Sequence, residues 1–241
     1  YQACSKITKD GGDLMRQERI VFMGTPEISK VYLQSLIDHQ YNIIATYTQP
    51  PRKQGRGMLM QKSPVHELSL EHNIPVYHPK NFASLESIDE LKKLKPDLVV
   101  IMGYGLLLPK SILQIPPYGC INIHVSLLPK WRGAAPIEYA ILNGDEKTGV
   151  SIFLLEEKLD AGPIIATQEI NINKNINKGN LASELNILGT VLLINTLPDL
   201  LDNKISVQKQ DETNATYAKK ITPEFRKINF NNEVNTVYNQ I

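Results

Sequence analysis

The stretch DLVVIMGYG, from Asp97 to Gly105, decides the fold. Its centre is an unbroken apolar run, so a strand formed here would be apolar on both faces. Strands of this kind lie inside parallel sheets, because helices packed on either side keep both faces from water. The stretch therefore predicts a buried central strand of an α/β sheet.

The segments around this strand alternate in type. Residues 19–24 predict a strand, and Thr25-Pro26 suits the start of a helix with proline at its first position. The patterns predict further strands at 41–49, 75–79, 118–126, 148–157 and 163–172, and helices at 64–72, 85–94, 134–142 and 180–202. This alternation predicts a doubly wound, mostly parallel open α/β sheet of Rossmann-like type, with an antiparallel hairpin near its end.

Changes in composition and in hydrophobic periodicity divide the chain into four parts. Residues 1–18 lack periodicity, and we expect a tail or non-native extension there. Residues 19–203 hold the predicted sheet, and the polar residues 204–230 are typical of a surface linker. From residue 231 a helical pattern begins that needs a second layer to cover its apolar side, so we expect residues 231–241 to begin a truncated second domain.

Composition limits the classes of function. The chain has 241 residues, 42% of them hydrophobic, and a formal charge of +1, which suits a globular protein with one full core. We see neither an apolar run of membrane-spanning length nor a signal peptide, and we expect a cytoplasmic protein with no membrane partner. The two cysteines, Cys4 and Cys120, provide no disulfide framework, and the histidines lack metal-ligand spacing, so we expect no metal.

The turn after the first predicted strand argues against one common ligand class. Gly24-Thr25-Pro26 lacks the glycine pattern that holds a pyrophosphate, which disfavours a dinucleotide site. No Gly-x-Ser-x-Gly motif supports serine hydrolysis. An open α/β sheet still binds ligands at the carboxyl ends of its strands, where the strand order reverses. Two central strands end near residues 104–105 and 125–126, so we expect a crevice there.

Two polar side chains lie just before one of these strand ends, in INIHVSLLPKWRGAAPI (121–137). Asn122 and His124 are two residues apart, so on a strand both project from the same face. A buried histidine is more often a hydrogen-bonded core residue than a catalyst, and that alternative stays open. The glycine- and proline-rich loop that follows favours a functional site.

A carboxylate would strengthen this pair. Asp160 lies in the turn KLDAGPI between two predicted strands. An aspartate in such a position often only caps its own turn, so by itself it is weak evidence. Between Pro50 and His66 the chain also carries basic residues and no acid, which indicates either a patch for an anionic partner or an ordinary solvated loop.

Taken together, these motifs resemble the folate-dependent formyltransferases. The family signature is Asn-x-His, then Ser-Leu-Leu-Pro and Arg-Gly, then an aspartate some three dozen residues later, and NIHVSLLPKWRG and LDAGPI match it. The resemblance covers roughly residues 19–241. The start RIVFMGTPEIS, the loop TQPPRKQGRG and the GAAPI after Arg132 are similar to the members that formylate methionyl-tRNA. Relatives that formylate a sugar-nucleotide amine lack that loop and are the alternative.

The resemblance implies transfer of a formyl group from 10-formyltetrahydrofolate to the α-amine of initiator methionyl-tRNA, for translation initiation. It implies that Asn122, His124 and Asp160 are catalytic. Asn122, and His124 if protonated, would donate to the formyl oxygen, while Asp160 would orient His124 and relay a proton. It also implies that the folate lies along Ser126, Leu127, Leu128, Pro129, Tyr104, Gly105 and Leu106.

For the tRNA, the resemblance implies contacts from Arg52, Arg56 and Lys62 in the basic loop. The sequence departs from the family at Met58 and Leu59, where lysines are usual, and this lowers the expected attraction to phosphate. Under the same resemblance we expect residues 19–203 to be the catalytic domain of a monomer. Residues 231–241 would then be the start of a truncated tRNA-binding domain.

Overall fold

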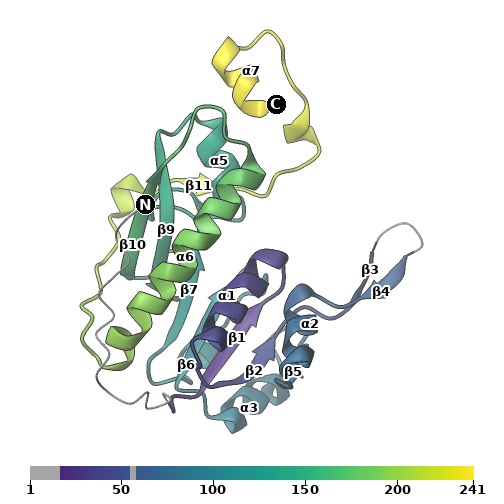
Figure 1. Cartoon of the computed structure of the whole chain (residues 1–241), viewed down its shortest axis with the longest axis vertical. Coiled ribbons are helices and arrows are strands. Elements are labelled where there is room, and N and C mark those ends of the chain that lie inside the picture. Colours follow the sequence, from purple (N-terminus) through teal and green to yellow (C-terminus); the bar gives the residue numbers. More distant parts are fainter. Residues whose placement is uncertain (1–16, 55–57) are drawn as a thin grey trace.

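The computed structural model of this chain describes residues 17–54 and 58–241. Its centre is a seven-stranded sheet in the order β10-β9-β7-β6-β1-β2-β5 (Figure 1). The strands are β1 (Ile20–Gly24), β2 (Ile43–Tyr47), β5 (Val76–Tyr77), β6 (Leu98–Met102), β7 (Cys120–His124), β9 (Lys147–Leu154) and β10 (Ile164–Asn171). The strands from β7 to β5 are parallel, and β9 runs antiparallel to both of its neighbours. This confirms the predicted doubly wound, mostly parallel α/β sheet.

Alternate residues of the central strands pack into two cores, one on each face of the sheet. In β1, Ile20 and Phe22 belong to one core, and Val21 and Met23 belong to the other. The first face is covered by α1 (Glu27–Asp38), α2 (Pro64–Glu71), α5 (Pro136–Leu142) and α6 (Lys178–Leu201), and the second by α3 (Leu85–Leu94) and α4 (Lys110–Leu113). Figure 1 shows α1 and α6 side by side over the sheet. Every residue of β1 and β6 is buried, because both faces are covered.

Local signals explain where several helices begin. The side chain of Ser63 accepts a hydrogen bond from the main-chain N–H of His66 at the start of α2, and Ser84 caps α3 in the same way. Asn177 caps α6. Each cap satisfies an N–H group that has no partner within the helix.

The strand order reverses between β1 and β6. From β1 the chain builds outward through β2 to β5, then crosses back to β6 and builds outward on the other side. Ligands of such sheets bind beyond the carboxyl ends of the strands at this reversal. The strands β1, β6 and β7 end there at Gly24, Met102 and His124. The fold thus brings the end of β7 to the edge where a crevice was predicted.

Helix α6 has the length and apolar composition that would allow a membrane span, contrary to the expectation of no such segment. It packs against α1, α5, β9 and β10, and its residues Leu181, Leu185 and Leu193 are fully buried in the first core. A core helix passes the same test of length and composition, so the packing gives α6 a role in the fold.

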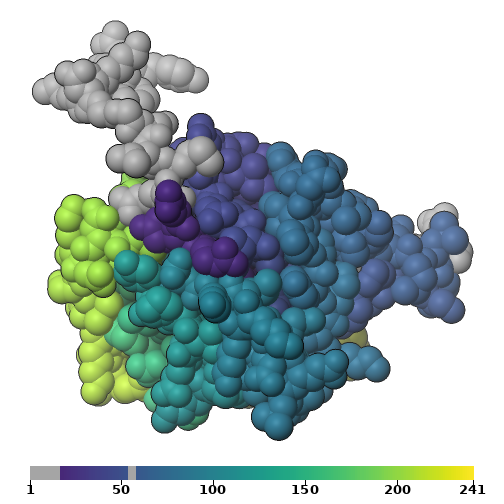
Figure 2. All heavy atoms as spheres, turned by 90° about the horizontal axis from the view of Figure 1, so that it is seen from below, coloured from purple at the N-terminus to yellow at the C-terminus, as the bar shows by residue number. Residues whose placement is uncertain are grey.

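A hairpin interrupts the predicted alternation after β2. Its strands β3 (Arg52–Gln54) and β4 (Leu59–Gln61) pair with each other and with no other strand of the described residues. The hairpin extends beyond α2 in Figure 1, and Figure 2 shows its described part as a protrusion from the body of the molecule. Leu59 and Met60 expose 70% and 62% of their surface.

The segment after α6 stays in contact with the sheet domain. It contains η1 (Glu212–Asn214), β11 (Tyr217–Ala218), η2 (Glu224–Arg226) and α7 (Val234–Gln240), and α7 packs against α5. Strand β11 pairs in parallel with β8 (Arg132–Gly133), and Gln208 bridges to Ile164. Gln210 and Ala218 are buried. The first half of the predicted linker therefore runs over the surface of the domain but is fixed to it by main-chain pairing and buried side chains.

Candidate active site

Asn122 and His124 lie at the end of β7. Their side chains project from the same face of the strand as that of Cys120. Cys120 belongs to the core beneath α3 and α4, where burial raises the pKa of its thiol to about 12, as suits a core residue. Asn122 pairs in register with Ile101 and Phe153 but is only partly buried. Its side-chain amide makes no hydrogen bond to any part of 17–54 or 58–241. It is therefore free to donate to a ligand.

His124 is held in one orientation by the loop that follows it. The residue is 6% exposed, and Nε2 lies 2.8 Å from the main-chain oxygen of Trp131. A carbonyl oxygen can only accept, so Nε2 carries a hydrogen and Nδ1 is the nitrogen free to take up or release a proton. Nδ1 lies 3.9 Å from Oδ2 of Asp160, which is too far for a direct hydrogen bond.

Asp160 reaches this histidine from the connection between β9 and β10. Its side chain is buried, and its φ of 46° lies in the left-handed region. Oδ2 accepts the N–H of Gly133 at 2.8 Å, so the carboxylate reaches across to another loop. That contact disfavours a simple turn cap. Within the described ranges, no group of three His, Cys, Asp or Glu side chains is placed to hold a metal ion.

The loop between β7 and β8 is tied together internally. The Ser126 hydroxyl donates to the main-chain oxygen of Lys130, and the Ser126 carbonyl accepts from Ser151. The Ser151 hydroxyl in turn accepts the N–H of Leu128, whose peptide bond to Pro129 is cis. The hydrogen of the Ser126 hydroxyl is thus used within the loop, so this hydroxyl has no donor left for a ligand.

Arg132 anchors the far end of the loop and is fully buried. Its guanidinium donates to Oε1 of Gln210 at 2.8 and 3.1 Å and to both carboxylate oxygens of Glu212. Burial by itself would lower the pKa of Arg132, but the bonds to Glu212 raise it overall, so the group stays charged. The bonds from Arg132, and secondly from Lys158, lower the pKa of Glu212 to about 2. A buried arginine is tolerated because it is paired in this way.

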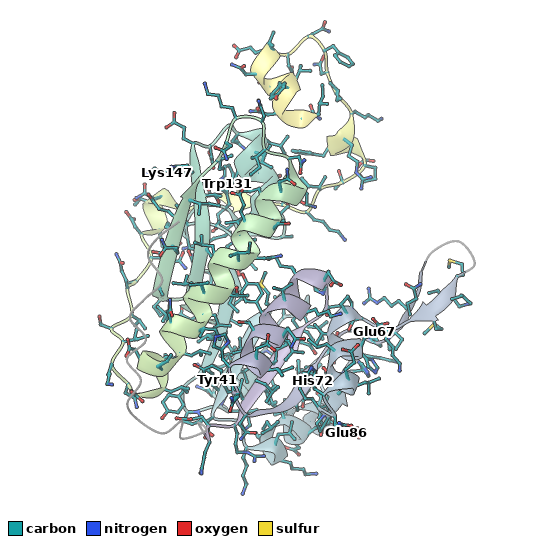
Figure 3. The ribbon with its side chains drawn as sticks, in the orientation of Figure 1. Tyr41, Glu67, His72, Glu86, Trp131 and Lys147 are labelled. Carbon is teal, nitrogen blue, oxygen red and sulfur yellow. The ribbon has the colours of Figure 1, made fainter. Side chains whose placement is uncertain are left out.

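Gly133 and Trp131 bring the loop close to its neighbours. Gly133 has a φ of 115°, and a Cβ at this position would lie 2.6 Å from the main-chain oxygen of Ala218. Only glycine allows this approach, which points the Gly133 N–H at Asp160. Trp131, which is labelled in Figure 3, has a φ of 59°. Its ring packs on Tyr139 of α5, and its Nε1–H donates to Asp145.

The second predicted folate segment follows β6. The main-chain oxygen of Tyr104 accepts from Thr25 and Gln49, while its buried hydroxyl has no partner among the described residues. Gly105 has a φ of 82° and open space where a Cβ would be. Leu106 packs against the second core. This segment offers an apolar edge and an open stretch of main chain.

The predicted tRNA residues lie at the hairpin. Arg52 and Lys62 are exposed at its base, and Arg56 is outside the described residues. Nη2 of Arg52 donates to Oε1 of Gln49 at 2.7 Å, and Nε2 of Gln49 donates to Tyr104. Gln49 therefore connects the base of the hairpin to the segment that follows β6.

Comparison with known proteins identifies the family. Residues 18–197 match the family described as formyl transferase. This chain belongs to the formyl transferase family. It is 44% identical over 223 residues to a methionyl-tRNA formyltransferase of Bacillus subtilis, covering 92% of this chain and 70% of the relative. A methionyl-tRNA formyltransferase of Ehrlichia ruminantium (strain Welgevonden) is 46% identical over 204 residues, which covers 84% of this chain and 67% of that one.

Solved formyl transferases share the fold. Phosphoribosylglycinamide formyltransferase from Bacillus halodurans superposes with a TM-score of 0.64 at 28% identity, over 76% of this chain and 95% of that one. An N-formyltransferase from Helicobacter canadensis, solved in complex with folinic acid and dTDP-3-aminofucose, gives a TM-score of 0.71 at 20% identity. That match covers 93% of this chain and 80% of the other, and at this identity it supports the fold alone.

Two residues that hold the segments beside His124 were given no role by the sequence. Arg132 was part of the matched motif, but nothing in the pattern showed that its side chain is buried. Gln210 lies in the segment predicted to be a linker, and a polar stretch without periodicity gives no sign of a buried member. The bond between Gln210 and Arg132 can be recognised only in the folded structure, where the segment after α6 lies against the loop that ends at Arg132.

Proposed function

We propose that this chain transfers the formyl group of 10-formyltetrahydrofolate to the α-amine of methionine esterified to initiator tRNA. The observation that carries the proposal is the convergence of His124 Nδ1 and Asp160 Oδ2, 3.9 Å apart, beside the end of β7, which also carries the free amide of Asn122. The similarity to methionyl-tRNA formyltransferases supports the choice of acceptor. The reaction would take place in the cytoplasm, as a step of translation initiation.

Asn122 would stabilise the charge that develops when the amine attacks the formyl carbon. Negative charge then grows on the formyl oxygen, and a fixed N–H donor stabilises that charge more than it stabilises the neutral carbonyl. Asn122 is suited to this because its amide has no other partner in the described structure and the strand fixes its direction. After Nδ1 of His124 has taken up a proton from the amine, it would add a second donor from the same face.

The pair His124 and Asp160 would receive the attacking amine. Two acceptors 3.9 Å apart can both accept from one nitrogen at about 2.9 Å each, so the gap fits an amine that donates two hydrogens. Nδ1 of His124 would then take the proton as the bond to carbon forms. The carboxylate of Asp160 would stabilise the resulting imidazolium, as a carboxylate beside a catalytic histidine does.

The proton balance closes without a covalent intermediate on the protein. The amine forms a new nitrogen–carbon bond and loses one proton, while the bond from the formyl carbon to the folate nitrogen breaks and that nitrogen gains one proton. His124 can carry the proton from the first nitrogen to the second, because Nε2 remains bonded to Trp131 throughout. No metal or nucleophilic side chain is needed for this sequence.

The folate would lie across the ends of β6 and β7. Leu127, Leu128 and Leu106 offer apolar contact, and Gly105 leaves main chain open at the rim. Small-molecule sites are mostly apolar with a few oriented polar groups, and main-chain N–H and C=O groups can supply these here. A hydrogen bond donated by Ser126 would come from its main chain, because its hydroxyl hydrogen is already donated to Lys130.

The hairpin would bind the tRNA through Arg52, Lys62 and Arg56. Exposed lysine and arginine side chains bind phosphate with an affinity that falls as salt rises. Gln49 places the base of the hairpin beside the proposed folate segment. A tRNA held by this hairpin would therefore have its aminoacyl end within reach of the site.

The test is an assay for N-formyl product. The chain is incubated with 10-formyltetrahydrofolate and either methionyl-tRNA or a nucleotide-linked amino sugar. We expect formylated methionyl-tRNA and no formylated sugar. Formylation of the sugar alone would replace the proposed acceptor, and no product with either amine would refute the proposed reaction.

A further inference from the structure

A buried glutamine joins the two segments that meet at His124. Gln210 is 5% exposed and lies after α6, outside the residues that match the family. Its Nε2 donates to the main-chain oxygens of Asp160 at 2.9 Å and Gly162 at 2.7 Å. Its Oε1 accepts from Nε and Nη2 of Arg132. One side chain thus spans from the Asp160 turn to the loop that ends at Arg132.

Each of these segments supplies one of the groups that face the imidazole. Trp131, which accepts from Nε2 of His124, directly precedes Arg132 in the chain. Asp160, which faces Nδ1, is itself held by Gln210 through its main-chain oxygen. The separation of Nδ1 and Oδ2 therefore depends on how the two segments are placed relative to each other. The bonds of Gln210 to Arg132, Asp160 and Gly162 hold that placement.

The chemistry of the contacts requires an amide at this position. A guanidinium has donors and no acceptor, and the two carbonyl oxygens of Asp160 and Gly162 have acceptors and no donor. A side chain between them must accept at one end and donate twice at the other. Among side chains of this length only glutamine does both, since glutamate cannot donate and methionine does neither strongly.

We infer that Gln210 is a positioning residue for the His124–Asp160 pair, and this inference rests on the function proposed above. The glutamine does not touch the reacting atoms. It holds the carboxylate of Asp160 where His124 needs it by bonding the main chain on which that carboxylate is carried. We call the bonds of Gln210 to Arg132, Asp160 and Gly162 the clamp. A displacement of about 1 Å in a catalytic group can lower a rate by about a hundredfold, so the loss of this clamp should lower kcat.

The test compares two substitutions of the same kind in one segment. Gln210→Glu keeps the size and the acceptor for Arg132 but turns the donors into acceptors that face two carbonyl oxygens. Gln208→Glu makes the same chemical change two residues earlier, where the side chain is exposed. We expect Gln210→Glu to lower kcat by about tenfold to a hundredfold with KM for the folate changed less than about twofold, and Gln208→Glu to match the unmodified chain.

A second readout needs no substrate. The 241-residue chain contains five histidines, and the ring signals of His124 in an ¹⁵N spectrum are assigned by their loss in His124→Asn. We expect Gln210→Glu to shift the His124 ring signals and leave those of the other histidines in place. If the glutamate variant does not fold, Gln210→Met replaces it, because methionine preserves the side-chain volume without the strong hydrogen bonds. We expect the same shift of the His124 ring signals in this variant.

Several results would overturn the inference. An unchanged kcat with only a lower melting temperature would make Gln210 a purely structural residue. A lower kcat with unchanged His124 signals would mean that the clamp acts elsewhere. If the unmodified chain formylates nothing, the proposed function fails, and unchanged His124 signals in both variants would separately refute the clamp.

Discussion

The loop at 126–133 and the hairpin at 52–61 both lie at the carboxyl edge of the sheet, but they are held in opposite ways. In the loop, Ser126, Trp131, Arg132 and Gly133 all bond to neighbouring segments, and Arg132 is completely buried. The hairpin pairs only with itself within the described residues, and Met58 exposes 61% of its surface.

The difference follows the physical demands on each region. Proton transfer and charge stabilisation require atoms fixed to fractions of an ångström, so the loop is anchored at many points. Attraction to a phosphate backbone falls slowly with distance and tolerates movement, so charged side chains on an exposed hairpin suffice. We therefore expect changes in the loop to lower kcat and changes in the hairpin to lower affinity for tRNA.

The largest effect is expected from Asp160→Asn. The asparagine can still accept the N–H of Gly133 but removes the charge that would stabilise protonated His124. We expect kcat to fall by about a thousandfold in a formylation assay, with folate affinity unchanged in a fluorescence titration. Asp145→Asn is the matched control, because Asp145 bonds Lys130 and the Trp131 ring and not the imidazole. Near-normal turnover in the Asp160 variant would remove this residue from the site.

A smaller loss is expected from Asn122→Ala. This substitution removes one donor to the developing oxyanion, which typically costs about 3 kcal/mol, or roughly a hundredfold in kcat. Steady-state kinetics should show KM for the folate little changed, since the interaction acts mainly in the transition state. An effect confined to KM would instead make Asn122 a binding residue.

In the hairpin, Arg52→Ala should affect tRNA and spare the chemistry. We expect the affinity for methionyl-tRNA to fall by roughly fivefold to tenfold at low salt, and the slope of log affinity against log salt to become shallower by about one. Filter binding at several salt concentrations measures both quantities. Lys174→Ala, on an exposed residue before α6, is the control. Equal effects of the two substitutions would contradict the hairpin assignment.

The smallest effect concerns Glu212, where the anchored loop meets solvent. Its pKa is lowered from 4.5 to about 2 by Arg132 and Lys158, so its ionised form stabilises the folded state above about pH 4.5. That stabilisation is lost as the pH falls through about 2. Thermal melts of Glu212→Gln should therefore differ from those of the unmodified chain near neutral pH and approach them at low pH. A difference that grows as the pH falls would contradict the pairing.

The sequence predicts the sheet better than it predicts the loop contacts. The apolar run at Leu98–Met102 and the alternation of strands and helices around it predict the fold, because hydrophobic periodicity shows which face of an element is buried. Asn122 and His124 could be placed on one face because they are two residues apart on a strand. The meeting of Asp160 with His124 is not visible in spacing and came only from the family resemblance. Gln210 was not predicted as a site residue, because the local sequence of a polar segment does not show which of its side chains is buried.

The most direct test of this account is a crystal structure of the chain with an unreactive analogue of 10-formyltetrahydrofolate that carries its formyl group at the N10 position. We expect its pterin beside residues 104–106 and its formyl oxygen within hydrogen-bonding distance of the Asn122 amide. The formyl carbon should face the gap between Nδ1 of His124 and Oδ2 of Asp160. A folate bound elsewhere, or a formyl group turned away from all three side chains, would contradict the account.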